Sequence, residues 1–300
     1  MQIPAHCELC PRHCGADRTR VRGRCQGGSQ VTVARAALHH WEEPCISGTR
    51  GSGAIFFSGC SLRCVFCQNH SISHDRFGKT VTVPQLRELC LDLIAQGAHN
   101  INFVTPTHFS HAVAAVLKEP LSVPVVYNCG GYERLETLQS LQGKIQIYLP
   151  DLKYADNALA ERYSAAPDYF ETAAAAIREM VRQTGPCRFD SDGLMTSGVI
   201  IRHLLLPGAL NNTKAVLDWI SETFVPGQVL VSLMAQYTPQ PGAEGLLARR
   251  VTGAEYRSAA AYMENVGIQS GYTQDAASAR AAYTPDFDLT GLAGLTQKEE

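Results

Sequence analysis

The chain has 300 residues, 45% of them hydrophobic and 18% charged, and its formal net charge is −2. This balance excludes a globally basic nucleic-acid binder and a polybasic membrane binder. No apolar run reaches the roughly 18 residues of a membrane-spanning helix, and MQIPAHCELC shows no secretory signal. We therefore expect a cytoplasmic globular protein that binds neither nucleic acid nor membranes.

Cysteines and arginines set the first 50 residues apart from the rest of the chain. The protein has eleven cysteines, and in a reducing compartment such clusters indicate metal or redox chemistry rather than disulfides. The spacing C-x2-C-x3-C-x10-C suits either a [4Fe-4S] cluster or a zinc ion, with Cys45 as a spare ligand. Its members are Cys7, Cys10, Cys14 and Cys25. The interleaved arginines lack aromatic neighbours, which favours a solvated or partner-protein surface over an RNA site.

Residues 31–41 are typical of a strand, and we interpret the polar run from His39 to Glu43 as a strand edge. After a flexible connector at 48–53, short apolar runs alternate with helical patterns. The predicted strands are 54–58, 100–104, 123–127, 145–149, 198–206 and 228–234. The predicted helices are 83–96, 108–118, 132–141, 168–183, 211–223 and 252–266.

This alternation predicts an α/β fold in which parallel strands are joined by right-handed crossovers. The apolar strands indicate burial on both faces. An open doubly wound sheet and a complete or partial barrel both satisfy the pattern. In either architecture, ligands bind beyond the carboxyl ends of the strands. Residues 268–300 are rich in turns and only weakly periodic.

The most specific motif follows the first of these strands: Cys60, Cys64 and Cys67 have the spacing C-x3-C-x2-C. Three thiolates can hold three irons of a [4Fe-4S] cluster and leave the fourth iron open to an exogenous ligand, whereas an electron-transfer cluster takes four cysteines. A zinc site completed by His70 or His74 is the alternative. The position of the motif at a strand's carboxyl end favours the cluster.

The motif C-x3-C-x-Φ-C, with Phe66 as the aromatic residue Φ, resembles that of the radical S-adenosylmethionine (SAM) superfamily. The text GAIFFSGCSLRCVFCQNHSIS is similar to the pyruvate formate-lyase-activating enzyme-like subgroup, which also carries an N-terminal cysteine segment. The resemblance implies a partial (β/α)6 barrel at 51–267. A cysteine-rich N-terminal extension at 1–50 would precede it, and a tail at 268–300 would pack on the barrel.

The same resemblance implies cofactor-binding residues at Phe66 of the motif and at the ends of the later strands. Thr105 and Thr107 stand where the superfamily often carries a Gly-Gly-Glu motif, whose acid is missing here. Asp151 and Lys153 match an activase Leu-Asp-Leu-Lys motif, and Asn128 stands where a second acid would be. Arg202 needs a partner inside the barrel, either the SAM carboxylate or Asp151. Gln236 is a further candidate for a contact with ribose or substrate.

The resemblance therefore implies a radical SAM enzyme that cleaves SAM reductively and forms a 5′-deoxyadenosyl radical for hydrogen abstraction. Its implied substrate is a glycyl radical enzyme, and its implied partner is an electron donor such as flavodoxin or ferredoxin. The alternatives are a radical SAM enzyme acting on a small molecule or RNA, and a non-catalytic zinc or iron–sulfur protein. The cofactors implied are a [4Fe-4S] cluster and SAM, with the N-terminal cysteines as a second cluster or zinc site.

Overall fold

The computed structural model describes residues 6–274 and 285–295, and its main feature is a ten-stranded sheet. The strand order is β10-β9-β8-β6-β5-β4-β2-β1-β3, with β7 paired to β8. Neighbouring strands are parallel from β2 to β9. These parallel strands are β2 (Ser52–Phe57), β4 (Ile101–Val104), β5 (Val125–Cys129), β6 (Ile147–Pro150), β8 (Met195–Leu204) and β9 (Leu230–Met234).

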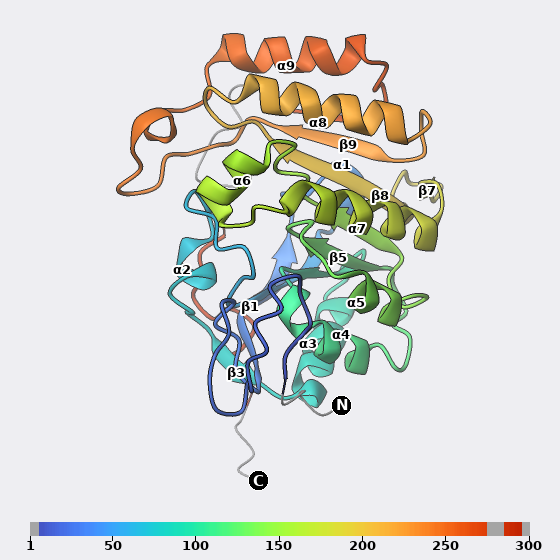
Figure 1. Cartoon of the computed structure of the whole chain (residues 1–300). Coiled ribbons are helices and arrows are strands. Elements are labelled where there is room, and N and C mark those ends of the chain that lie inside the picture. The colour runs from blue at the N-terminus through green and yellow to red at the C-terminus, as the bar shows by residue number, and fades with distance from the viewer. Residues whose placement is uncertain (1–5, 275–284, 296–300) are drawn as a thin grey trace.

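Each of these six strands is followed by a helix, as the sequence predicts. The helices are α3 (Val83–Ala95), α4 (Ser110–Val116), α5 (Leu135–Ser140), α7 (Tyr169–Thr184), α8 (Leu210–Thr223) and α9 (Gly253–Asn265). Because the six strands follow chain order and β9 and β2 are not paired with each other, they form a partial (β/α)6 barrel. The predicted fold class is confirmed. Figure 1 shows α8 and α9 side by side over β9.

The shorter elements extend or connect this barrel. β1 (Val31–His39) pairs antiparallel with β2 and with β3 (Lys79–Val81). β10 (Gly271–Thr273), which the sequence did not indicate, lies parallel to β9. The remaining elements are α1 (Pro44–Ser47), α2 (His70–Ser73), η1 (Thr107–Phe109), α6 (Asn157–Ser164), β7 (Arg188–Phe189) and η2 (Gly245–Ala248). Among the described helices, none is long and apolar enough to cross a membrane.

Helix boundaries follow local sequence signals. Thr82 precedes α3. Its side chain accepts a hydrogen bond from the Gln85 backbone amide, and its own backbone amide donates to the Gln85 side chain. Such a capping box satisfies two amides that the first helical turn leaves unpaired. The stripe Leu86, Leu89 and Leu93 then faces the core, where each residue is at most 2% exposed.

The barrel interior is apolar at the amino ends of the strands. Cys45 and Ile46 of α1 pack there against apolar side chains of β5, β6, β8 and β9. The Asn100 side-chain amide donates to the Ile46 carbonyl at 2.7 Å, and the hydroxyl of Ser52, at the start of β2, reaches Asn100 at 2.6 Å. α1 therefore closes the amino end of the barrel, and the carboxyl end is left for a site.

The C-terminal tail contacts β1, which lies near the end of the strand order away from β10. Arg35 on β1 donates to the Asp288 carboxylate at 3.0 Å, and the Ala36 amide donates to the Thr290 carbonyl at 2.9 Å. Residues 286–295 thus lie against β1. The three-part division at 50 and 267 stays a prediction.

Candidate functional site

The three cysteines of the C-x3-C-x2-C motif lie in the loop between β2 and α2. Cys64 is buried, and Cys60 and Cys67 are half-buried. The Ser164 hydroxyl donates to Cys64 Sγ at 2.9 Å. Burial raises the pKa of the Cys60 thiol to about 12. The Cys60 thiol therefore holds its proton at neutral pH, and metal binding would release it.

Further donors and cations surround the same thiols. The Ser73 hydroxyl hydrogen-bonds to Cys67, and Lys153 is electrostatically close to Cys67 and Cys64. Arg24 lies near Cys64 on another side. Donors and cations of this kind stabilise thiolate sulfur and tune iron–sulfur clusters. The donor set fits three irons of a [4Fe-4S] cluster.

As they stand, the described residues do not bring three or more His, Cys, Asp or Glu side chains together in an arrangement that could hold a metal ion. The loop is nevertheless anchored on both sides. Gln68 donates to the Gln236 carbonyl beyond β9 at 2.6 Å, and the Val65 amide donates to the Tyr163 carbonyl at 2.9 Å. The loop thus spans the mouth from β2 to α6 and β9.

Phe66 is almost fully buried, at 6% exposure, beneath this loop. Its ring meets three tyrosine rings edge to face, at centroid distances of 6.4 Å to Tyr154, 6.2 Å to Tyr163 and 6.4 Å to Tyr237. Edge-to-face contacts of this kind fix ring orientation. Phe66 therefore packs the loop onto the barrel, and its predicted role in cofactor binding stays untested.

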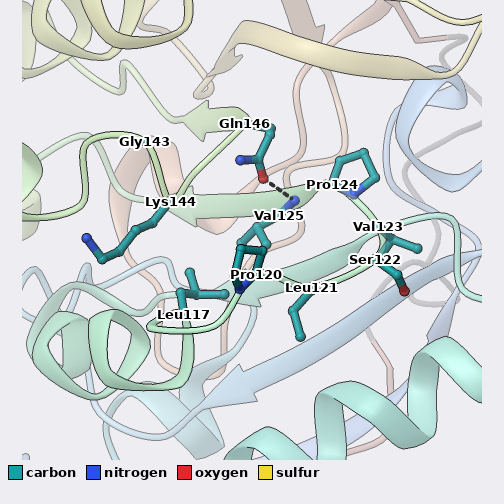
Figure 2. Close-up of a pocket in the computed structure, with 10 residues that line it drawn as sticks. All are labelled: Leu117, Pro120, Leu121, Ser122, Val123, Pro124, Val125, Gly143, Lys144 and Gln146. Carbon is teal, nitrogen blue, oxygen red and sulfur yellow. Dashed lines mark hydrogen bonds between the residues drawn. The ribbon is translucent and has the colours of Figure 1, made fainter.

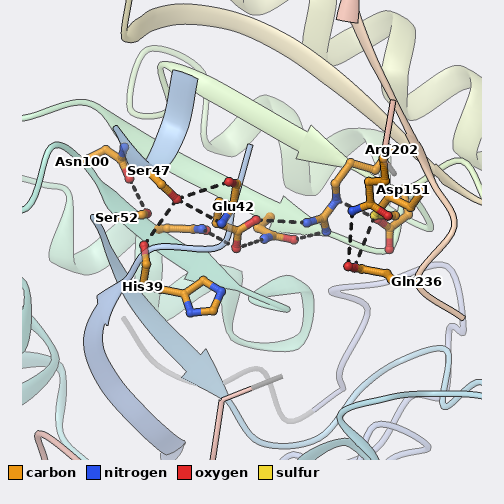
Figure 3. A network of polar contacts seen from close by, with 12 residues as sticks. His39, Glu42, Ser47, Ser52, Asn100, Asp151, Arg202 and Gln236 are labelled. Atoms are coloured by element: carbon orange, nitrogen blue, oxygen red, sulfur yellow. Dashed lines mark hydrogen bonds and ion pairs between the residues drawn. The ribbon is translucent and has the colours of Figure 1, made fainter. Parts of the chain in front are cut away.

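A polar network fills the barrel interior near the carboxyl ends of the strands (Figure 3). Arg202 Nε donates to Asp151 Oδ1 at 3.0 Å, and Arg202 Nη2 donates to Asn128 Oδ1 at 2.6 Å. Arg202 Nη1 donates to Glu42 Oε2 at 3.3 Å. Asp151 also pairs with Lys153. Three different strands thus bring together the predicted residues Asn128, Asp151, Lys153 and Arg202.

The partner of Arg202 is therefore Asp151, one of the two expected, together with an unexpected carboxylate. Burial alone would raise the pKa of Asp151, but Lys153 and Arg202 hold it below its ordinary value. Burial raises the pKa of Glu42, while Arg202 acts in the opposite direction. Each side-chain nitrogen of Arg202 thus has an acceptor within the chain, and Lys153 is electrostatically close to Cys64 of the cysteine loop.

The sequence interpretation missed Glu42. The run from His39 to Glu43 is not a strand edge throughout, because β1 ends at His39 and the chain then turns into the barrel. Glu42 Oε1 accepts from Asn102 Nδ2 at 3.1 Å and from Asn128 Nδ2 at 3.2 Å. Its neighbour Glu43 is 8% exposed. Both partners of Glu42 lie 60 or more positions away, so no local pattern could have revealed them.

A second missed acid, Glu133, lies beside the end of β4. Thr107 Oγ1 donates to Glu133 Oε1 at 2.5 Å, and the Tyr127 hydroxyl donates to Oε2 at 3.1 Å. Burial raises the pKa of Glu133 to about 7. Thr105, which has a positive φ of 59°, donates its amide to the Asn128 carbonyl at 2.8 Å. A buried acid from the loop after β5 thus lies beside Thr107 at the end of β4.

A separate cavity of about 270 Å³ lies away from these residues, and Figure 2 shows its lining. It lies near the amino ends of β5 and β6, beside Leu117, Pro120 and Lys144. The Val125 amide donates to Gln146 Oε1 there at 3.0 Å. None of the predicted site residues lines it, so the candidate site remains the carboxyl-end mouth.

Comparison with known proteins gives distant likenesses. No family model matches the chain. An uncharacterized protein of Methanocaldococcus jannaschii is 29% identical over 275 residues, which cover 88% of this chain and 75% of that protein.

Three solved structures are similar at low identity. Methylornithine synthase is 16% identical with a TM-score of 0.47, over 80% of this chain and 72% of that one. A mutant of spore photoproduct lyase is 11% identical with a TM-score of 0.48, over 73% and 74%. A domain of pyruvate-formate lyase-activating enzyme from Bacteroides vulgatus is 12% identical with a TM-score of 0.37, over 64% and 91%. The fold assignment rests on the strand order of this chain.

Proposed function

We propose that the protein is a radical SAM enzyme. The observation that carries the proposal is the C-x3-C-x2-C loop itself, which follows the first parallel strand and opens at the carboxyl-end mouth of a partial (β/α)6 barrel. Ligand sites of such barrels lie at that end. A zinc site with His70 or His74 is less well supported, because the two rings stack on each other at 4.2 Å and His70 also pairs with Asp75.

In this proposal Cys60, Cys64 and Cys67 hold three irons of a [4Fe-4S] cluster. Bound there with SAM, the cluster supplies one-electron cleavage of a sulfur–carbon bond, which yields a 5′-deoxyadenosyl radical. The residues of the chain bind and orient. Ser164 and Ser73 donate to two of the thiolate sulfurs.

The polar residues of the mouth suit the amino-acid end of SAM. Lys153 is electrostatically close to Cys64 and Cys67 of the loop and is offered to the carboxylate, whereas Arg202 is held by Asp151, Glu42 and Asn128. Arg202 is thus a positioning residue that fixes the Asp151–Lys153 pair. Glu133 and Thr107 offer acceptors to the ammonium group at the end of β4.

The substrate is a finer step of the same proposal. We infer a protein glycine, so that the enzyme activates a glycyl radical enzyme and takes its electron from a flavodoxin or ferredoxin. The support is the similarity of the text around the triplet to the activating-enzyme subgroup. A small-molecule or RNA substrate is the competing proposal, and the negative net charge weighs against RNA.

The test is anaerobic reconstitution with iron and sulfide, followed by dithionite and SAM. We expect 5′-deoxyadenosine from the native sequence and none from Cys60→Ala. Cys187→Ala is the matched control, because Cys187 is a half-buried cysteine outside both cysteine groups. Equal 5′-deoxyadenosine from the native protein and Cys60→Ala would refute the enzyme and leave a non-catalytic metal protein.

A further inference from the structure

We propose that Cys7, Cys10, Cys14 and Cys25 bind a second centre of a thiophilic metal, either one zinc ion or one [4Fe-4S] cluster. The site lies in the N-terminal segment, defined here as residues 6–28. It is independent of the proposed function, because it uses none of the cysteines of the triplet.

The backbone brings these four cysteines near one another, although their side chains as they stand do not form a group that could hold a metal ion. The Cys7 amide donates to the Ala16 carbonyl at 3.1 Å, and the Gly15 amide donates back to the Cys7 carbonyl at 3.2 Å. A β-carbon added to Gly23 would lie 2.7 Å from Cys14 Sγ, so the returning chain runs directly against that sulfur. Cys25 is electrostatically close to Cys7 and Cys14, and Cys10 to Cys25 and Cys7.

The segment has little else to fold around. Its described residues form no helix or strand, and its buried apolar residues are Cys7, Cys10, Ala16 and Cys25. Hydrogen bonds such as that from Thr137 Oγ1 to the Leu9 carbonyl tie it to the barrel, and a metal is a common further brace for a region with so small an apolar core. All four cysteines are free thiols. Metal binding is therefore the bond that this segment has the residues to make.

A buried arginine points to negative charge at the same place. Arg18 is 3% exposed and donates to the carbonyls of Gly28 at 3.0 Å and His108 at 2.5 Å. Its Nη2 has no hydrogen-bond partner, and within the described part of the chain no carboxylate pairs with it. A buried charge without a counter-charge is costly. Cys25 lies close to Arg18, so metal-bound thiolates would supply the missing charge.

The sulfur of Cys25 already accepts a hydrogen bond from the backbone. The Gly27 amide points at Cys25 Sγ at 3.4 Å. Amide donors to sulfur stabilise thiolate ligands. Cys14 is the exposed member of the set, which gives a metal a route of entry.

The proposed centre would adjoin the triplet loop. The Cys60 amide donates to the Cys25 carbonyl at 3.2 Å, and a β-carbon on Gly59 would lie 2.3 Å from that oxygen. Arg12 reaches over the loop to the Ser61 carbonyl at 2.9 Å. The metal thus fixes a wall of the mouth.

The test measures metal in a protein that cannot hold the triplet cluster. The variant Cys60→Ala/Cys64→Ala/Cys67→Ala is purified anaerobically and analysed by inductively coupled plasma mass spectrometry. We expect about one zinc or about four irons per chain. Zinc and iron identify the two forms of the centre. Less than about 0.2 metal of any kind per chain would overturn the proposal.

A second variant guards against misfolding of the triple variant. Cys14→Ser in the otherwise native chain changes the exposed ligand alone, and it should lose the metal of one centre while Cys187→Ala loses none. Trypsin gives an independent readout at Arg20 and Arg22, which are exposed within the segment. Chelation should speed cleavage there about tenfold, because the segment then opens locally. An unchanged metal content in Cys14→Ser together with an unchanged cleavage rate would contradict the site.

A failed 5′-deoxyadenosine assay with metal still present in the triple variant would refute the proposed function and leave this site standing. Formation of 5′-deoxyadenosine by the native protein, with no metal in the triple variant, would refute this site and leave the proposed enzyme function standing.

Discussion

Arg202 and Arg18, two arginines that the structure largely removes from solvent, find their partners in different ways. Arg202, inside the barrel, pairs with Asp151 and Glu42 and with the Asn128 side chain. Arg18, in the N-terminal segment, is buried as well but donates only to carbonyls and retains an unpartnered Nη2. Each side-chain nitrogen of Arg202 thus has an acceptor within the chain. Arg18 lies over the Phe109 ring but has no anionic partner among the described residues.

A third buried charge is handled in another way. Glu133 accepts hydrogen bonds from the uncharged Thr107 and Tyr127, and burial raises its pKa to about 7. Glu133 therefore binds a proton below about pH 7, whereas Arg202 is paired with carboxylates. Arg202, Glu133 and Arg18 therefore respond differently to substitution. The largest effect is expected for Arg202.

Replacing Arg202 should have the largest effect. Arg202→Met leaves Glu42 buried without its cation and leaves Asp151 with Lys153 alone, and removing one partner of a buried ion pair costs about 3 to 5 kcal/mol. Urea denaturation measures this change in the free energy of unfolding. A loss below about 1 kcal/mol would mean that the network is solvated and not buried.

Glu133 should make stability fall as pH rises. Its folded pKa of about 7 lies above the ordinary glutamate value of 4.5, so the native state binds the extra proton between these values. Stability is therefore greatest below the unfolded pKa and decreases as pH rises through the folded pKa, by about 3 kcal/mol at most.

The difference between the native sequence and Glu133→Gln, followed by urea denaturation from pH 4.5 to 7.5, isolates this contribution. We expect the native protein to lose more stability over this range than the variant. Parallel curves would show that Glu133 keeps its ordinary pKa.

Arg18 should affect metal retention more than folding. If thiolates supply its counter-charge, Arg18→Gln should release the N-terminal metal to a chelator about tenfold faster, as expected for the loss of a supporting contact. Arg134→Gln, on a surface arginine that also contacts the segment through Glu8, is the matched control. Equal release rates in both variants would contradict the idea that metal-bound thiolates supply the counter-charge of Arg18.

The smallest effect is expected far from both arginines. Thr252 caps α9 in a capping box with Glu255. Thr252→Ala should cost about 1 kcal/mol of unfolding free energy and leave metal content and 5′-deoxyadenosine formation unchanged. A change in metal content would show that the measurement follows global stability and not the site.

Much of the fold was predictable because its signals are local. Alternating apolar runs and helical stripes located all six parallel strands and the helices that follow them, and boundaries differed by a few residues. The short helix α6 and the strand β10 were not indicated. β10 is three residues long and pairs only with β9 through contacts about 40 positions apart.

The candidate site, too, was predictable only where its signals are local in the sequence. The sequence alone determined the triplet, the N-terminal cysteine spacing and the polar residues at strand ends, because motif spacing and strand periodicity are properties of neighbouring residues. Tertiary structure decided that Glu42 joins Arg202 across 160 positions, that Glu133 reaches Thr107, and that Cys25 lies against Cys60. Such pairs depend on which strand ends meet at the mouth and on where buried charge must be neutralised, and no local pattern carries that information.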